Sequence, residues 1–131
     1  MFASTHLRVA RATNQLAEVV RFYRDGLGFE VVGSFQGHDG FDGAMLGHPG
    51  AGYHLEFTHR RGEQVGRAPT EENLLVFYLP ERREWETALS RMVAQGYEPT
   101  KSTNPYWDQR GVTFEDPDGY RVVIENAAWP S

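Results

Sequence analysis

Residues 7–30 read LRVARATNQLAEVVRFYRDGLGFE and decide the fold, because the chain repeats their pattern once. An apolar strand that begins at Leu7 is followed by an amphipathic helix and then by Gly28. The same succession begins again at Leu75 and reaches Gly96, 68 residues later at both points. A repeat of this length is too long for a solenoid unit and predicts a duplicated half-domain.

The repeat also pairs two carboxylates. Glu56 lies between two apolar residues of an alternating stretch, and Glu125 follows an apolar stretch 69 residues further on. If the two halves fold alike, Glu56 and Glu125 lie on equivalent strands. Pseudo-symmetry could then bring the two strands together.

Length and composition limit the class of protein. The chain has 131 residues, of which 40% are hydrophobic and 24% charged, which is typical of one globular domain. The net charge of −5 argues against a nucleic-acid partner. No apolar run approaches the length of about 20 residues that spans a membrane, and no signal peptide is recognisable, so we expect a cytoplasmic protein. Because there is no cysteine, any metal must be held by His, Asp or Glu.

Hydrophobic periodicity predicts two helices and eight strands. One helix is expected between a cap at Thr13-Asn14 and Gly26, and the other between Pro80 and Gly96. Each half then reads βαβββ, as residues 1–60 and 73–131 joined by a linker at 61–72. The expected strands are His6–Ala10, Phe29–Phe35, Phe41–Leu46, Tyr53–His59, Leu74–Leu79, Tyr97–Lys101, Gly111–Glu115 and Tyr120–Glu125.

Alternation along the strands predicts which side chains face away from the helices. Apolar residues should pack on the helix, so the polar residues between them point to the opposite face. The strand at 74–79 is apolar throughout, and its sequence allows either Leu74, Val76 and Tyr78 or their neighbours to face this side. The polar residues expected there are His6, Arg8, His54, Glu56 and Glu125.

Two segments give the chain a resemblance to a known family. The segment Phe22-Tyr23-x-x-x-Leu27-Gly28-Phe29 and the turn Asp116-Pro117-Asp118-Gly119-Tyr120, within two βαβββ halves, resemble the vicinal oxygen chelate superfamily. That group includes glyoxalase I, extradiol dioxygenases and the fosfomycin and bleomycin resistance proteins. The resemblance implies a single α+β domain at 1–131, whose eight-stranded mixed sheet curves into a partial barrel with the helices outside. It also implies a homodimer.

The resemblance further implies where a metal site should lie. Glyoxalase-like members carry one His on the first strand of each half and one Glu on the last. Glu56 matches the first-half Glu. The other three expected positions hold Ser4, Asn73 or Leu74, and Val123. The usual four-ligand set is therefore incomplete.

A displaced metal site remains an alternative, built from His6, Glu56 and Glu125 with His54 nearby. Imidazole and carboxylate groups suit Zn²⁺, Ni²⁺, Mn²⁺ or Fe²⁺. A shift of two residues, however, moves a side chain about 6.6 Å along a strand, which is far more than metal–ligand bonds tolerate.

The sequence allows two functions. The first is a binder of a small oxygen-bearing molecule, similar to the bleomycin resistance proteins. Its ligand contacts would be Arg8, His54, Tyr78, Tyr106 and Trp107. The second is a metal-dependent lyase, isomerase or dioxygenase in which His6, Glu56 and Glu125 are catalytic. The incomplete ligand set favours the binder, and the paired carboxylates favour the enzyme.

Overall fold

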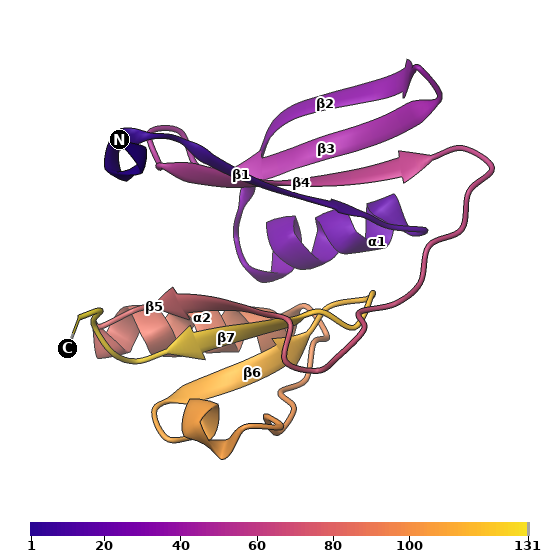
Figure 1. The fold of residues 1–131 in the computed structure, drawn as a ribbon. Helices are drawn as coiled ribbons and strands as arrows, with labels where there is room; N and C mark the ends of the chain where they lie inside the picture. Colours follow the sequence, from indigo (N-terminus) through magenta and orange to yellow (C-terminus); the bar gives the residue numbers. More distant parts are fainter. Residues whose placement is uncertain (131) are drawn as a thin grey trace. The chain divides into compact units, whose positions relative to one another are not determined.

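The computed structural model describes residues 1–130 and divides the chain into two compact units, Met1–Val65 and Gly66–Ser131. Each unit combines one sheet with one α-helix (Figure 1). The α+β class expected from the sequence is therefore confirmed. Among the helices of residues 1–130, none is long and apolar enough to cross a membrane.

Unit 1 is a four-stranded sheet covered on one face by a helix (Figure 1). The strand order is β1-β4-β3-β2, and β1 runs parallel to β4 while the other pairs are antiparallel. A short turn of 3₁₀ helix at Phe2–Ser4 precedes the sheet. The elements are β1 (Leu7–Ala12), α1 (Leu16–Arg21) with a π-helical turn (Phe22–Gly26), β2 (Glu30–His38), β3 (Phe41–Gly47) and β4 (Tyr53–Arg60).

The core of unit 1 lies between this helix and the sheet. Val19, Phe22 and Tyr23 are fully buried, and Leu55 and Phe57 of β4 are almost so. The rings of Tyr23 and Phe57 are 4.8 Å apart. Since Leu55 and Phe57 face the helix, the residues between them face the opposite side, which we call the open face of the sheet.

The helix begins later than its sequence suggests. The expected cap at Thr13-Asn14 is wrong, because the N-cap of α1 is Gln15. Thr13 instead accepts a bond from the Gln15 amide at 3.0 Å. The amide side chain of Asn14 bonds the backbone of Val65 twice, at 2.7 and 2.8 Å, and is therefore not available to the helix.

Unit 2 is a three-stranded sheet in the order β5-β7-β6, with α2 along one face (Figure 1). First and last strands again pair in parallel, and β6 is antiparallel to β7. Trp85 of α2 donates to the Ile124 carbonyl at 2.9 Å. The elements are β5 (Leu74–Tyr78), α2 (Arg82–Ala94), a 3₁₀ turn (Pro105–Asp108), β6 (Gly111–Glu115) and β7 (Arg121–Glu125).

The expected strand Tyr97–Lys101 is wrong. Only Thr100 makes a single bridge, to Thr113. Pro99 has no amide hydrogen to give to a ladder, and the Ser102 amide bonds the Asp108 carboxylate at 3.2–3.3 Å. The described strands therefore form sheets of four and three strands.

The open face of unit 2 is defined by the side chains that pack on its helix. Val112 and Phe114 line an apolar groove together with Leu89 and Val93 of α2. Antiparallel pairing places Val112 opposite Ile124 and Phe114 opposite Val122, so these four share the helix side. The alternate residues of β7, namely Arg121, Val123 and Glu125, therefore face away from the helix, as strand alternation predicts.

A buried arginine, Arg121, connects the start of unit 2 to its last strand. The side chain of Arg121 is only 6% exposed. It donates to Glu115 Oε2 at 3.2 Å, to Glu71 Oε2 at 3.1 Å and to the Lys101 carbonyl at 3.2 Å. Thr103 donates to the other oxygen of Glu71 at 2.8 Å. One guanidinium thus joins three segments that are distant in the sequence.

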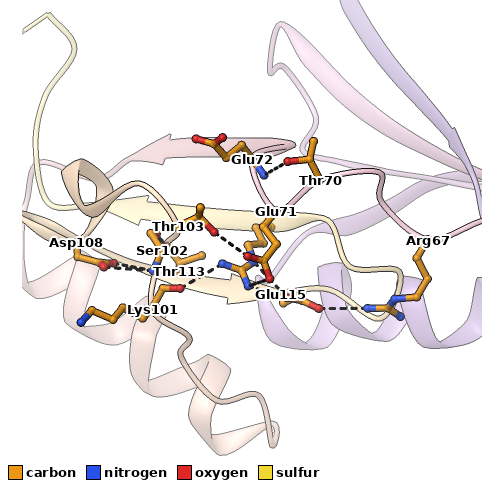
Figure 2. A network of polar contacts seen from close by, with 11 residues as sticks. Arg67, Thr70, Glu71, Glu72, Lys101, Ser102, Thr103, Asp108, Thr113 and Glu115 are labelled. Carbon is orange, nitrogen blue, oxygen red and sulfur yellow. Dashed lines mark hydrogen bonds and ion pairs between the residues drawn. The ribbon is translucent and has the colours of Figure 1, made fainter.

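Arg67 adds a second anchor for the same segment (Figure 2). It donates to Glu115 Oε1 at 3.2 Å and to the Pro117 carbonyl at 2.9 Å. The Ala68 amide bonds the Asp118 carbonyl at 2.8 Å. Residues 67–71 therefore pack on unit 2 without forming a strand.

We predict that Arg121→Met lowers the free energy of unfolding by about 2 kcal/mol, because Glu71 and Glu115 lose charge-assisted bonds but remain solvated enough to avoid the full cost of burial. Urea unfolding measures the change. Arg82→Met is the matched control: Arg82 is 75% exposed and forms a surface ion pair with Glu86, so this change should cost less than about 0.5 kcal/mol. Equal losses in the two variants would contradict the role given to Arg121.

Candidate functional site

The open face of unit 1 brings together four polar side chains named from the sequence. In the parallel register Arg8 lies opposite His54, and Ala10 lies opposite Glu56. His54 and Glu56 flank Leu55, which faces the helix, so both point to the open face. The rings of His6 and His54 are 4.8 Å apart. We call His6, Arg8, His54 and Glu56 the β1–β4 cluster.

Hydrogen bonds within the cluster assign the protons of both imidazoles. Arg8 Nε donates to Nε2 of His54 at 2.8 Å, so this nitrogen carries a lone pair. The proton of His54 is then on Nδ1, which lies 2.6 Å from Nε2 of His6. His6 accepts at Nε2 and is itself protonated on Nδ1. Both rings are neutral in this arrangement.

The surroundings of His54 favour its neutral form. Partial desolvation lowers the pKa of His54 below its ordinary value, and the positive charge of Arg8 and the neighbouring His6 lower it further. Glu56 opposes this shift in part. A neutral imidazole can continue to accept the proton of Arg8 Nε, so electrostatics and hydrogen bonding agree.

Glu56 is much less exposed than Arg8. Its side chain is 13% exposed, against 50% for Arg8, and its Oε2 lies 3.7 Å from Nη1 of Arg8. This distance allows an ion pair but is too long for a hydrogen bond. Glu56 therefore balances the charge of Arg8 without taking up its hydrogen-bond donors.

The cluster does not fit a divalent metal ion. The Nε2 lone pair of His54, which a metal would need, is occupied by the Arg8 proton, and that of His6 is occupied by His54. A guanidinium also stands 3.7 Å from the carboxylate that would complete the set. Within each unit, residues 1–130 bring together no three His, Asp or Glu side chains that could hold a metal. The displaced metal site from His6, Glu56 and Glu125 gains no support within either unit.

Glu125 occupies a different environment on the open face of unit 2. It is 5% exposed, and its Oε2 is buried without a hydrogen-bond partner among the described residues. The carboxyl group lies over Gly111, its antiparallel partner: a Cβ on Gly111 would fall 1.4 Å from Glu125 Oε2. The same Cβ would lie 2.8 Å from the Trp107 carbonyl oxygen. Only glycine leaves room for this carboxyl group.

Burial favours the neutral form of Glu125. Desolvation raises the pKa of the Glu125 carboxyl above its ordinary value, and Asp108 contributes in the same direction. Arg110 opposes the shift in part. A protonated carboxyl group could donate a hydrogen bond where a carboxylate could only accept one.

The three aromatic residues predicted from the sequence to contact a ligand, Tyr78, Tyr106 and Trp107, all lie in unit 2. Tyr78 pairs with Glu125 in the parallel register, so its side chain lies on the same open face. Of the two alternatives for β5, the structure therefore shows the one in which Leu74, Val76 and Tyr78 face this side. The Tyr78 ring is 6.0 Å from that of Trp129. Tyr106 and Trp107 meet edge to face at 5.0 Å, and Tyr106 is 53% exposed.

Reasoning from the sequence missed Gly111. The sequence does contain a signal for this contact. The tight turn at 116–119 sets the register of the two strands that it joins, and this register pairs residue 111 with residue 125. A glycine directly opposite a glutamate marks a place where that side chain can fold over the backbone. The positions of Asp108 and Arg110 had no such signal.

Comparison with known proteins identifies close relatives. Residues 7–58 match the family model "YycE-like N-terminal domain", and residues 72–126 match "YycE-like C-terminal domain". Protein YycE of Bacillus subtilis is 45% identical over 126 residues, which is 96% of this chain and 91% of that protein. The crystal structure of YycE superposes with a TM-score of 0.88 over 95% of this chain and 91% of that one. It is described as a protein of unknown function of the glyoxalase/fosfomycin resistance type.

More distant structures share the fold. Glyoxalase I of Leishmania major, a trypanothione-dependent enzyme, gives a TM-score of 0.69 at 17% identity, over 92% of this chain and 84% of that one. TnmS3, an antibiotic-binding protein of Streptomyces sp. CB03234, gives 0.67 at 18% identity, over 95% and 97%.

We predict that Glu125→Gln makes the protein more stable at neutral pH. Because burial raises its pKa, the folded state binds this proton more tightly than the unfolded chain does, so stability falls as pH rises above the ordinary value of 4.5. A neutral amide removes this part of the pH dependence. Urea unfolding at pH 4.5 and at neutral pH measures it. Glu98→Gln, at an exposed position, is the control. A wild-type pH profile in the Glu125→Gln variant would contradict the prediction.

We predict that both imidazoles of the β1–β4 cluster carry their proton on Nδ1 at neutral pH. Because the pKa of His54 is lowered on folding, stability falls as pH drops below about 6.5, where the unfolded chain takes up this proton first. Long-range ¹H–¹⁵N spectra report the tautomers, and a pH titration reports the pKa. Arg8→Gln should raise the pKa of His54. Arg60→Gln, at the far end of the strand that carries His54, should leave this pKa unchanged. An Nε2–H tautomer for His54 would contradict the assigned network.

Proposed function

The chain belongs to the YycE-like family of the vicinal oxygen chelate superfamily, and from this and the β1–β4 cluster we propose that it binds a small oxygen-bearing molecule without a metal ion. The observation that carries the proposal is the state of Arg8. Its side chain is half exposed on the open face, and its Nε donates to His54 at 2.8 Å. A fixed, partly desolvated cation with free donors is suited to oxygen atoms of a ligand.

Unit 2 contributes a second kind of contact in this proposal. Tyr78 lies on the same open face as Glu125, and Tyr106 is an exposed ring that contacts the half-buried Trp107. Aromatic rings stack on the flat apolar parts of small molecules.

The family resemblance supports the remaining features of the proposal. In this proposal two copies form a homodimer in the cytoplasm. TnmS3, which has the same fold, is an antibiotic-binding protein, so a binder on this fold has a precedent.

A metal-dependent lyase, isomerase or dioxygenase is the second candidate, with His6, Glu56 and Glu125 as its catalytic residues. One observation favours it: Glu56 stands where the resemblance places the first-half glutamate. The arrangement of Arg8 opposes it, because the guanidinium occupies the lone pair of His54 and stands next to Glu56. The binder therefore explains more of the cluster.

An NMR screen with small oxygen-bearing fragments, both anionic and neutral, tests the proposal on the intact chain. We expect binders to shift amide signals of residues 6–8 and 54–56 with dissociation constants of about 1 mM, which is usual for fragments of this size. The exposed strand end around Arg60 serves as an internal control. If no compound in the library shifts the signals of the β1–β4 cluster, the proposed function is wrong.

A further inference from the structure

The β1–β4 cluster contains a cation, the guanidinium of Arg8, among the residues that the sequence offered as metal ligands. We propose that Arg8 replaces the metal ion that the family resemblance implies, and that its guanidinium directly binds a small oxyanion, a carboxylate or a phosphonate. This inference rests on the proposed function, and it narrows the ligand from any oxygen-bearing molecule to one chemical class.

The first argument is that Arg8 takes up the ligand atoms that a metal would use. Its Nε bonds the Nε2 lone pair of His54 at 2.8 Å, and its Nη1 faces Glu56 Oε2 at 3.7 Å. Nε2 of His6 accepts the hydrogen bond from Nδ1 of His54 at 2.6 Å. A divalent ion could enter only after the guanidinium had left, and it would meet the repulsion of that charge on the way.

The second argument is that most of the hydrogen-bonding capacity of Arg8 remains available. A guanidinium has five N–H donors, and His54 takes one of them. The contact with Glu56 is longer than a hydrogen bond. Among residues 1–130, neither Nη1 nor Nη2 donates a hydrogen bond to another residue, and half of the side chain is exposed. Although Nη1 forms an ion pair with Glu56, the N–H groups of Nη1 and Nη2 therefore remain available as hydrogen-bond donors to a ligand.

The third argument is that this edge is held in position. Bonding at Nε fixes the guanidinium plane relative to His54, and His6 fixes His54 in turn. Two parallel N–H groups on a fixed plane match two oxygens of a carboxylate or phosphonate. A lysine would supply the charge but neither the Nε bond nor the paired donors. The geometry therefore points to arginine-specific recognition of an oxyanion.

Titration of the intact protein with acetate and with methylphosphonate tests this inference. Both probes should shift the Arg8 Nε signal and the His54 ring signals. Arg8→Gln should weaken binding about tenfold or more, since a charge-assisted pair is lost. Arg8→Lys should weaken binding as well, because it keeps the charge but loses the paired donors. Arg82→Gln, on the exposed face of α2, should bind as the wild type does.

The outcomes separate this inference from the function on which it rests. If neutral fragments shift the β1–β4 signals but neither oxyanion does so at millimolar concentration, the inference is wrong and the proposed function stands. If Arg8→Gln binds methylphosphonate as tightly as the wild type, the inference is also wrong. A stoichiometric shift of the His6 and His54 signals by Zn²⁺ in the wild type would overturn the replacement of the metal by Arg8.

Discussion

Parallel pairing between the first and last strand of each unit is the constraint on which both polar faces depend. In a parallel pair, residues in register point to the same side of the sheet, so a side chain on one strand finds its neighbour on the other. This pairing places Arg8 beside His54 and Glu56 in unit 1, and Tyr78 beside Glu125 in unit 2. The helix between the two strands makes the parallel connection possible and occupies the other face of the sheet.

The same pairing produces opposite results for the two carboxylates of the repeat. Glu56 forms an ion pair with a guanidinium and remains partly exposed to solvent, whereas Glu125 folds over Gly111 and buries its Oε2 without a hydrogen-bond partner among residues 1–130. The two units thus share a fold but divide the polar chemistry between them. One carries a neutralised charge cluster, and the other carries a carboxyl group that favours its protonated form.

Strand alternation alone predicted which residues share a face, because side chains alternate strictly along a strand. It placed His54, Glu56 and Glu125 away from the helices correctly. The pairing of Arg8 with His54 depends on the register of a long-range contact, which no local pattern encodes. The error at Tyr97–Lys101 has a local cause, since Pro99 removes a donor and Ser102 bonds Asp108. Glu125 is buried over Gly111, next to the loop that carries Trp107. The sequence repeat only pairs Glu125 with Glu56, so it does not predict this burial.

The anchoring of residues 67–71 by Arg121 has a consequence for how this chain can change in evolution. A segment without regular structure between two folded units is ordinarily free to vary in length, since a longer loop costs little free energy. Here Glu71 must reach the guanidinium of Arg121 while Arg67 reaches Glu115. An insertion between these two residues would pull one of them away from its partner. We expect length variation among relatives to concentrate before residue 67 and to be rare between residues 67 and 71.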